Sequence, residues 1–344
     1  MKIEREKHGL FYNQNVDIFT LSNNTGMKVK ISQLGGIITH LWVPDEKGNI
    51  ADVVAGYDEI KSYAEPQHFM GALIGRVANR IEGAQYTLAG KTHKLNANVY
   101  DGKHNLHGGY LGYNLRVWRL IEIKQEKEFV ALHLKLFDQD GEQGFAGNVV
   151  VDAVYTLTDK NLLKLEMTAT TDMATPVSFT EHSYFNLNGH DSGSIENHVL
   201  QLNSTFLLEQ KEDRMPTGKV LDVANTCMDF SAPTLLTTSV QEMHDEGINH
   251  SYVMDNHDKE LILMATLSAA GRQLKISSNE QTLHFYNGHN LNDVKGKNGA
   301  VYSRFSALCL EPKNYVNGIN IDAFPSNILH PGEIYNHSIL YDFG

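Results

Sequence analysis

Cysteine is scarce in this chain, which has only Cys227 and Cys309 among 344 residues. Small secreted domains are commonly held together by several disulfides, and two cysteines in a chain of this length do not make such a framework. We therefore expect both thiols to be reduced and simply packed within the fold.

Long apolar stretches are missing as well, since no window approaches the 18 consecutive apolar residues of a membrane-spanning helix. The segment Met1–Gly9 is polar and charged, and it lacks the apolar core of a signal peptide. We expect a chain that does not cross a membrane and is located in the cytosol.

Basic residues are outnumbered, with 29 Lys and Arg against 41 Asp and Glu and a net charge of −12. Binding to nucleic acid requires a basic face that neutralises phosphates, and an anionic membrane surface has the same requirement. The charge balance therefore disfavours both partners and, to a lesser degree, a sugar phosphate. A neutral small molecule is the ligand that fits most easily.

Motifs for metals, nucleotides and serine nucleophiles are absent too. The 17 histidines form no H-E-x-x-H or H-x-H pattern, and there is no C-x-x-C. The chain also lacks G-x-G-x-x-G, a P-loop and G-x-S-x-G. We expect a site that uses neither a metal ion nor an organic cofactor.

Alternation of apolar and polar residues is the dominant pattern that is present. In Phe129–Leu136, every second residue from Val130 is Val or Leu, whereas His133 and Lys135 lie on the opposite face. This period of two is typical of a half-buried strand. The same alternation occurs in Gly147–Leu157, Leu162–Thr170, Glu260–Leu267, Arg272–Ser277 and Gln281–Tyr286.

Helical signals, by contrast, are few and short. Tyr57–Ala64 and Thr238–Glu246 each have room for a turn or two, which is too short for crossover helices between parallel strands. The Gly- and Asn-rich stretch Asn287–Ser303 is predicted to be a loop, either over a site or simply on the surface. We expect an all-β fold, a sandwich or a barrel, built as a single domain over residues 1–344.

Four segments place polar groups beside aromatic residues and glycines, namely Gly75–Arg80, Asn105–Gly109, Thr180–Leu187 and Leu308–Pro312. Spacing alone leaves a structural interpretation open for each of them. In that interpretation, Arg76 and Arg80 are surface arginines, His107 is a turn histidine, His182 is a satisfied sheet histidine and Glu311 ends a strand.

Glu311 carries one additional signal, because it follows the apolar run Ala307–Leu310. Such a run predicts a buried strand, so the carboxylate lies either at a rim or in desolvated surroundings. Desolvation raises the pKa of a carboxyl group toward the range that suits a general base.

Taken together and in this order, the four segments resemble the aldose 1-epimerase (galactose mutarotase) family. The best matches are Gly75–Ile81 (GRVANRI), Asn105–Gly109 (NLHGG) and His182–Leu187 (HSYFNL), while Asp52–Tyr57 and Pro331–Glu333 resemble the beginning and the end of the family pattern. The resemblance implies a large antiparallel β-supersandwich with an open sugar cleft. It also implies an isomerase that interconverts the α and β anomers of a free aldose.

The resemblance further implies a role for individual residues. Glu311 and His182 match the family's catalytic pair, in which the carboxylate takes the C1 hydroxyl proton and the histidine gives one to the ring oxygen. Asn79 and Arg80 match the residues that hold the substrate, and His107 matches a second active-site histidine.

Several positions depart from the family pattern. Asn249 stands where the family usually has an Asp that binds sugar hydroxyls, and His284 stands where it has a Gln. Glu181 replaces the usual Asn before the catalytic histidine, and Pro312–Lys313 replaces Thr-Gln. We therefore expect the proton-transfer pair to be kept and the preferred sugar to be an aldose other than galactose, or a reducing disaccharide.

Aromatic rings commonly stack on sugars, and the candidates for this contact are Tyr184, Phe185, Phe285 and Tyr286. Two alternative functions stay open. A glycoside hydrolase would use a pair of carboxylates such as Glu181 and Glu311, and a carbohydrate-binding protein of the same fold would catalyse nothing. The expected partner is a small-molecule sugar, bound by a monomer or a homodimer.

Overall fold

The computed structural model describes residues 1–64, 68–237, 247–256 and 258–344. The largest of its sheets, which we call the main sheet, has nine antiparallel strands within these ranges. In spatial order they are β11 (Arg119–Gln125), β12 (Phe129–Asp138), β13 (Val149–Thr158), β14 (Leu162–Thr171), β29 (Tyr335–Asp342), β23 (Arg272–Ser278), β22 (Ile262–Ala269), β17 (Val199–Leu202) and β20 (Thr234–Leu235).

Two further sheets each contain five strands in the described ranges. The N-terminal sheet consists of β1 (Lys2–Phe11), β2 (Gln14–Ser22), β3 (Lys28–Ser32), β4 (Ile38–Pro44) and β5 (Ile50–Asp52). The second, which we call the site sheet, has the spatial order β19 (Pro216–Asp222), β18 (Phe206–Gln210), β21 (Asn249–Val253), β24 (Thr282–Tyr286) and β27 (Cys309–Lys313).

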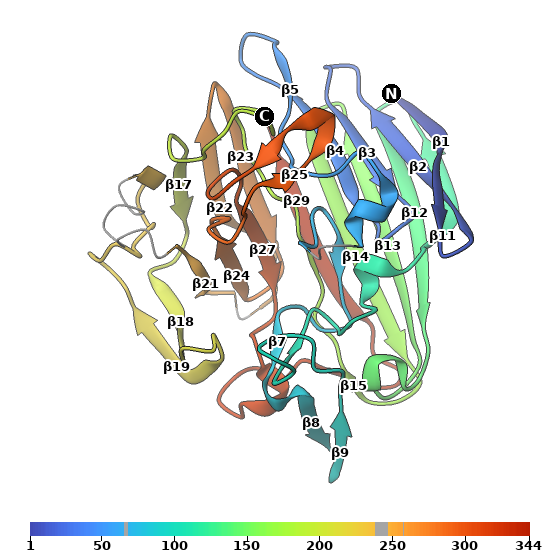
Figure 1. The fold of residues 1–344 in the computed structure, drawn as a ribbon, viewed down its shortest axis with the longest axis vertical. Helices are drawn as coiled ribbons and strands as arrows, with labels where there is room; N and C mark the ends of the chain where they lie inside the picture. The colour runs from blue at the N-terminus through green and yellow to red at the C-terminus, as the bar shows by residue number, and fades with distance from the viewer. Residues whose placement is uncertain (65–67, 238–246, 257) are drawn as a thin grey trace.

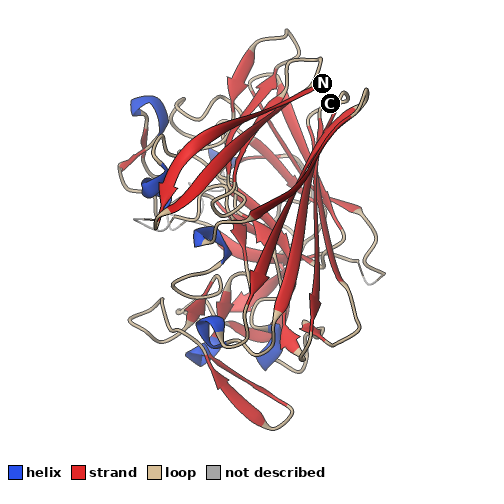
Figure 2. Cartoon of the chain, turned by 90° about the vertical axis from the view of Figure 1, so that its right-hand side faces the viewer, coloured by secondary structure: helices blue, strands red, loops and turns tan. Residues whose placement is uncertain are grey.

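The predicted alternation is confirmed in β12, β13, β14 and β23. It is wrong for Gln281–Tyr286, because β24 is buried on both faces between neighbouring layers of the fold. In β13 every second residue from Val149 to Leu157 is buried, and the residues between them are partly exposed. Side chains from all three sheets then join one apolar core, as Phe19, Leu165 and Leu283 illustrate. The fold is therefore all-β, as Figure 2 shows from the side.

Short strands connect the large sheets. They are β6 (Leu73–Ile74), β7 (Arg80–Ile81), β8 (Gln85–Leu88), β9 (Lys91–Lys94), β10 (Asn105–Leu106), β15 (Thr175–Pro176), β16 (Thr180–Glu181), β25 (Val294–Lys295), β26 (Val301–Tyr302) and β28 (Ile328–Leu329). The hairpin β8–β9 projects from the end of the molecule opposite the two termini (Figure 1).

The helices that lie wholly within the described ranges are 3₁₀ turns of three or four residues. They are η1 (Ile60–Tyr63), η2 (Glu82–Ala84), η3 (Tyr113–Leu115), η4 (Glu142–Gly144), η5 (Lys297–Gly299) and η6 (Gly318–Asn320). The turn η1 confirms the short helical signal in Tyr57–Ala64, whereas Thr238–Glu246 lies outside the described residues. None of the helices that the structure describes has the length and hydrophobicity needed to cross a membrane.

The stretch Asn287–Ser303 is more ordered than the predicted loop, because it contains β25, η5 and β26. It is anchored by Lys297, whose Nζ lies 2.6 Å from the Asp52 carboxylate and also donates to the carbonyl oxygens of Thr39 and Val54. A buried ammonium group needs such partners, and composition alone does not indicate them.

Candidate active site

One cavity of about 200 Å³ collects the predicted site residues. Its lining includes Asn79, Arg80, His107, His182, Asn249, His284 and Glu311. Residues from six separate parts of the chain, including all four motif segments, therefore meet at one place, as expected. The cavity is completed by His68, Phe69, Leu106, Tyr184, Tyr286 and Asn290.

The site sheet supplies one wall of the cavity through strand register. On β21, β24 and β27, Ser251 lies opposite His284, and His284 lies opposite Glu311. Directly opposed residues on neighbouring strands share a face of the sheet. The alternation of side chains then places Asn249, two residues before Ser251, on this same face.

Glu311 is buried, with 1% of its surface exposed, so it is not the exposed end of a strand. Its Oε1 lies 3.6 Å from His182 Nε2. Its Oε2 has no hydrogen-bond partner among the residues that the structure describes. A buried carboxylate oxygen without a partner is unusual and marks a group that is available to a ligand.

His182 follows β16, which pairs with β6 and so ties this segment to the region of Gly75–Arg80. Its ring stacks on Tyr184 with centroids 5.2 Å apart and an interplanar angle of 20°. Its Nδ1 lies 3.5 Å from Cys309 Sγ, which leaves Nε2 directed toward Glu311. The stacking on Tyr184 and the contact of Nδ1 with Cys309 therefore fix the nitrogen that faces the carboxylate.

The opposite wall is formed where β7 and β10 pair, with Leu106 opposite Arg80. His107 N donates to Asn79 O at 2.9 Å, and Asn79 N donates to His107 Nδ1 at 3.2 Å. Arg80 Nη1 donates to Asn79 Oδ1 at 2.8 Å. These contacts hold Asn79 and His107 with positive φ values of 62° and 53°, a strained conformation that is common at functional sites.

Gly108 explains how closely the two segments approach one another. A Cβ atom on this residue would lie 2.1 Å from the carbonyl oxygen of Gly75. Only glycine therefore allows the segment after His107 to pack against the segment before Asn79.

The protonation of His107 follows from its surroundings. Burial, together with the nearby charges of His182 and Arg80, lowers the pKa of His107 well below its usual value, so the ring is neutral. Because Nδ1 accepts the hydrogen bond from Asn79, the proton of the neutral ring is on Nε2. Burial also lowers the pKa of Arg80, but a guanidinium remains charged at neutral pH.

Asn249 and His284 interact with each other as well as lining the cavity. His284 Nε2 lies 2.7 Å from Asn249 Oδ1, and His284 Nδ1 lies 2.8 Å from Ser251 Oγ. Burial and the charges of Lys313 and Arg80 lower the pKa of His284 well below its usual value. Both ring nitrogens of this neutral histidine are thus already in hydrogen bonds.

Glu181 is buried behind the cavity and does not line it. Its carboxyl oxygens lie 2.8 Å from Ser183 Oγ and 2.8 Å from Tyr341 OH. Burial raises the pKa of Glu181 to about 7. Glu181 and Glu311 therefore do not face one another across a sugar site, as a glycoside hydrolase of the kind considered above requires.

Of the four aromatic residues that the sequence offered for stacking on the sugar, two line the cavity and two do not. Tyr184 and Tyr286 line the cavity, whereas Phe185 and Phe285 point into the core. Phe69 was missed, although its ring lies 4.6 Å from that of His107. No motif surrounds Phe69, and only the three-dimensional packing reveals its place.

Arg76 and the two cysteines also have clear positions in the structure. Arg76 is not a surface arginine, because it is buried and its Nε lies 2.7 Å from Asp138. Both cysteines are free, with Cys309 buried and Cys227 partly buried. Cys309, His182 and Glu311 offer ligand atoms within 4.8 Å of one another, which is a possible metal-binding arrangement that the sequence motifs do not predict.

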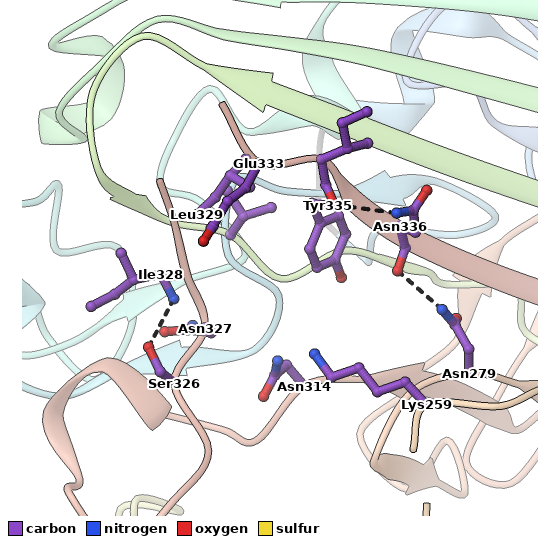
Figure 3. Close-up of a pocket in the computed structure, with 12 residues that line it drawn as sticks. Lys259, Asn279, Asn314, Ser326, Asn327, Ile328, Leu329, Glu333, Tyr335 and Asn336 are labelled. Atoms are coloured by element: carbon purple, nitrogen blue, oxygen red, sulfur yellow. Dashed lines mark hydrogen bonds between the residues drawn. The ribbon is translucent and has the colours of Figure 1, made fainter. Parts of the chain in front are cut away.

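A second cavity of about 590 Å³ lies elsewhere, beside the start of β29. Figure 3 shows its lining, in which Lys259 and Glu333 are the charged groups and most others are amides and aliphatic side chains. Among the described residues that line it, there is no histidine to pair with the carboxylate. Of these two cavities, only the smaller one therefore places a histidine beside a carboxylate.

Comparison with known proteins agrees with this geometry. The family model described as Aldose 1-epimerase matches residues 17–342. A galactose mutarotase from Sus scrofa is 36% identical over 330 residues, which cover 95% of this chain and 94% of that protein. An aldose 1-epimerase from Haemophilus influenzae is 33% identical over 298 residues, which cover 86% of this chain and 85% of that protein.

Solved structures confirm the galactose mutarotase-like fold. The aldose epimerase homologue from C. elegans has a TM-score of 0.85 at 27% identity, covering 94% of this chain and 98% of that one. The galactose 1-epimerase from Lactobacillus acidophilus shares the fold with a TM-score of 0.86 at 24% identity, covering 100% of this chain and 98% of that one. The chain thus belongs to the aldose 1-epimerase family.

Proposed function

We propose that this protein is an aldose 1-epimerase that interconverts the α and β anomers of a free aldose through acid–base ring opening. The observation that carries the proposal is the pair formed by Glu311 and His182, whose Oε1 and Nε2 atoms lie 3.6 Å apart in the cavity. Membership of the family and the relatives' printed names support the same reaction.

The reaction requires two proton transfers on one sugar. The C1 hydroxyl loses a proton to Glu311, and the ring oxygen gains a proton from His182, so the C1–O5 bond breaks and a free aldehyde forms. Rotation about C1–C2 presents the other face of the aldehyde, and the two groups then act in reverse to close the ring. Each positioned proton transfer typically contributes on the order of 10²–10⁴-fold to the rate.

Arg80 and His107 provide donors for the sugar oxygens on the opposite wall. Arg80 carries a positive charge, and the neutral His107 presents the N–H of its Nε2 atom. Such preorganised donors stabilise charge that develops on oxygen during ring opening. Tyr184 and Tyr286 supply ring faces for the apolar side of the sugar.

Polarimetry on freshly dissolved single-anomer sugars tests the proposal. We expect the rate of anomerisation to rise with the concentration of wild-type protein and to fall to the spontaneous rate with Glu311→Gln. A sugar-binding protein would instead bind the sugar, as measured by calorimetry, without any change in rate. Equal rates for wild-type protein and buffer across a panel of aldoses and reducing disaccharides would refute the enzymatic function.

We also retain the remaining expectations as predictions. They are a single domain over residues 1–344, assembly as a monomer or a homodimer, a cytosolic location, and a reaction that uses no metal ion or organic cofactor. The preference for a sugar other than galactose rests on Asn249 and His284 and is likewise a prediction.

A further inference from the structure

A chain of hydrogen bonds runs from the interior of the site sheet to the cavity. Lys313 Nζ donates to Ser251 Oγ at 3.0 Å. Ser251 Oγ lies 2.8 Å from His284 Nδ1, and His284 Nε2 lies 2.7 Å from Asn249 Oδ1. Lys313 and Ser251 are completely buried and do not line the cavity, so they reach the sugar only through the other two residues.

The direction of every proton in this chain follows from the lysine. An ammonium group only donates, so Ser251 Oγ accepts from Lys313 and its own proton goes to His284 Nδ1. The neutral ring then carries its proton on Nε2, which donates to Asn249 Oδ1. The amide nitrogen of Asn249 is left for the cavity, since no residue in the described ranges accepts from it.

The reverse arrangement leaves a proton without a partner. If the proton of His284 were on Nδ1, Ser251 Oγ would accept from both His284 and Lys313. The hydroxyl proton of Ser251 would then have no acceptor, because its Oγ has only these two partners in the part of the chain that the structure describes. A buried polar group left unpaired typically costs about 1–3 kcal/mol.

We propose that Lys313 is a positioning residue for substrate specificity, which acts through Ser251 and His284 to hold the amide nitrogen of Asn249 toward the sugar. This inference rests on the proposed function, because it concerns the sugar of the same site. An aspartate at position 249 would offer only acceptors, whereas the held amide offers a donor. The site is therefore built for an aldose whose contacted oxygen accepts a hydrogen bond, and it tolerates an ether or glycosidic oxygen there.

The charge on Lys313 supports this assignment at neutral pH. Burial lowers the pKa of Lys313 to about 8, while the nearby Glu311 carboxylate opposes that effect and Arg80 adds to it. The side chain is thus still mostly protonated at neutral pH, where the following experiments are carried out.

The position of the proton on His284 is measured directly by two-bond proton–nitrogen correlation spectra of isotope-labelled protein. The His284 signals are assigned by their loss in His284→Gln. We expect Nε2 to carry the proton in the wild-type protein and this preference to weaken in Lys313→Met. A proton on Nδ1 in the wild-type protein would overturn the proposal.

The orientation of Asn249 is measured by kinetics with deoxy and deoxyfluoro analogues of glucose, since a C–F group accepts a hydrogen bond but cannot donate one. At one ring position, we expect the ratio of kcat/KM for the fluoro and deoxy sugars to fall about tenfold in Asn249→Asp. Lys313→Met and Ser251→Ala should lower the same ratio at the same position, with kcat for glucose changing less than the ratio.

We call the hydrogen-bond chain from Lys313 to Asn249 the relay. Two variants of the relay and one control variant keep the outcome interpretable. Ser251→Ala interrupts the series of hydrogen bonds without removing a charge, so it replaces Lys313→Met if that variant does not fold. Lys297→Met removes another fully buried lysine, whose Nζ binds Asp52, Thr39 and Val54 and none of Ser251, His284 and Asn249, and it should leave the fluoro-to-deoxy ratio unchanged. An unchanged ratio in both Lys313→Met and Ser251→Ala would overturn the proposal.

The spectroscopic measurement does not require a catalytically active protein. The proposed function and the hydrogen-bond chain can therefore be refuted independently. An inactive wild-type protein with the His284 proton on Nε2 would refute the proposed function and support the hydrogen-bond chain. An active protein with the proton on Nδ1 would do the opposite.

Discussion

The polar groups of the cavity fall into two sets with different tasks, the reaction wall and the recognition wall, and the two sets differ in how far their atoms are hydrogen-bonded. These sets are functional, because Glu311 belongs to the reaction wall although it lies beside His284 on the site sheet. On the reaction wall, defined as Arg80, His107, His182 and Glu311, atoms such as Glu311 Oε2 and Arg80 Nε lack a partner in the described part of the chain. On the recognition wall, defined as Asn249 and His284 with Ser251 and Lys313 behind them, the ring of His284 is bonded at both nitrogens.

This difference separates two requirements of a catalyst. A group that exchanges a proton with a substrate has to be left free of competing protein partners, although an unpaired buried atom is costly. A group that only orients the substrate benefits from being fixed by its neighbours. Substitutions on the reaction wall should therefore reduce turnover, and those on the recognition wall should mainly change which sugar is preferred.

The largest effect is expected for Glu311→Gln. The amide is close to the same shape and cannot act as a base, so kcat should fall by about 10²-fold or more with the fold retained. Polarimetry gives the rate, and a thermal melt checks the fold. A variant that keeps more than about a tenth of wild-type turnover would contradict the role of Glu311 as base.

His182→Gln comes next, with an expected loss of kcat on the order of 10²-fold because the ring oxygen loses its proton donor. His107→Gln on the same wall is the matched comparison. It displaces a hydrogen-bond donor, because an amide N–H does not coincide with the Nε2–H of the ring, and it removes no proton transfer, so the loss should be about tenfold. Equal losses in the two variants would show that His182 is not the acid.

Asn249→Asp tests the recognition wall and should act on preference rather than on turnover. The carboxylate offers only acceptors, so kcat/KM for galactose should rise relative to the best wild-type substrate, by about tenfold. The measurement is a ranking of kcat/KM over a panel of aldoses and reducing disaccharides. If galactose is already the fastest sugar for the wild-type protein, the reasoning from Asn249 and His284 is wrong.

Glu181→Gln should change turnover least among these carboxylate and histidine variants, because Glu181 lies behind the reaction wall. It should change the pH dependence of stability instead. Burial raises the pKa of Glu181 to about 7 in the folded protein, above the unfolded value of about 4.3. The folded state therefore holds this proton more tightly, and stability decreases as the pH rises between these two values.

Glu181→Gln removes this titration, so the free energy of unfolding should depend less on pH in this range. The stability of Glu181→Gln relative to the wild-type protein, taken as the difference between their free energies of unfolding, should be about 3 kcal/mol greater at pH 8 than at pH 5. Denaturant unfolding at several pH values provides the measurement. Parallel pH profiles for the two proteins would mean that Glu181 is not protonated in the folded state.

No loss of activity is expected from prolonged chelation, although His182, Cys309 and Glu311 lie close enough to bind a metal ion. These groups act on protons in the proposed reaction and need no Lewis acid. Activity that disappears with a chelator and returns only with a divalent ion would replace the proposed mechanism with a metal-dependent one.

Local patterns predicted the strands, whereas the site residues were predicted through the resemblance to the aldose 1-epimerase family. Alternation placed the strands, and the motifs around Arg80, His107 and His182 brought the expected residues to one cavity. From spacing alone, Glu311 could be either the exposed end of a strand or a buried base. Its burial in the structure excludes the exposed strand end.

The relay behind Asn249 could not be predicted, for a topological reason. Ser251, His284 and Lys313 interact because β21, β24 and β27 are neighbours, although β22 and β23 intervene in the sequence and belong to another sheet. The sequence showed Pro312–Lys313 as a departure from the family pattern, but strand order is required to see what Lys313 contacts. Phe69 was missed for a similar reason, since it approaches His107 only through packing.

The place of β29 in the main sheet has a consequence for folding kinetics. This strand, Tyr335–Asp342, pairs with β14 on one side and β23 on the other, so it joins the two halves of the main sheet. The contacts of β29 with β14 link residues more than 160 positions apart, those with β23 link residues more than 60 apart, and such non-local pairing slows folding. During synthesis, the main sheet is therefore completed only after β29 has left the ribosome, and until then β14 and β23 expose unpaired edges that are prone to aggregation.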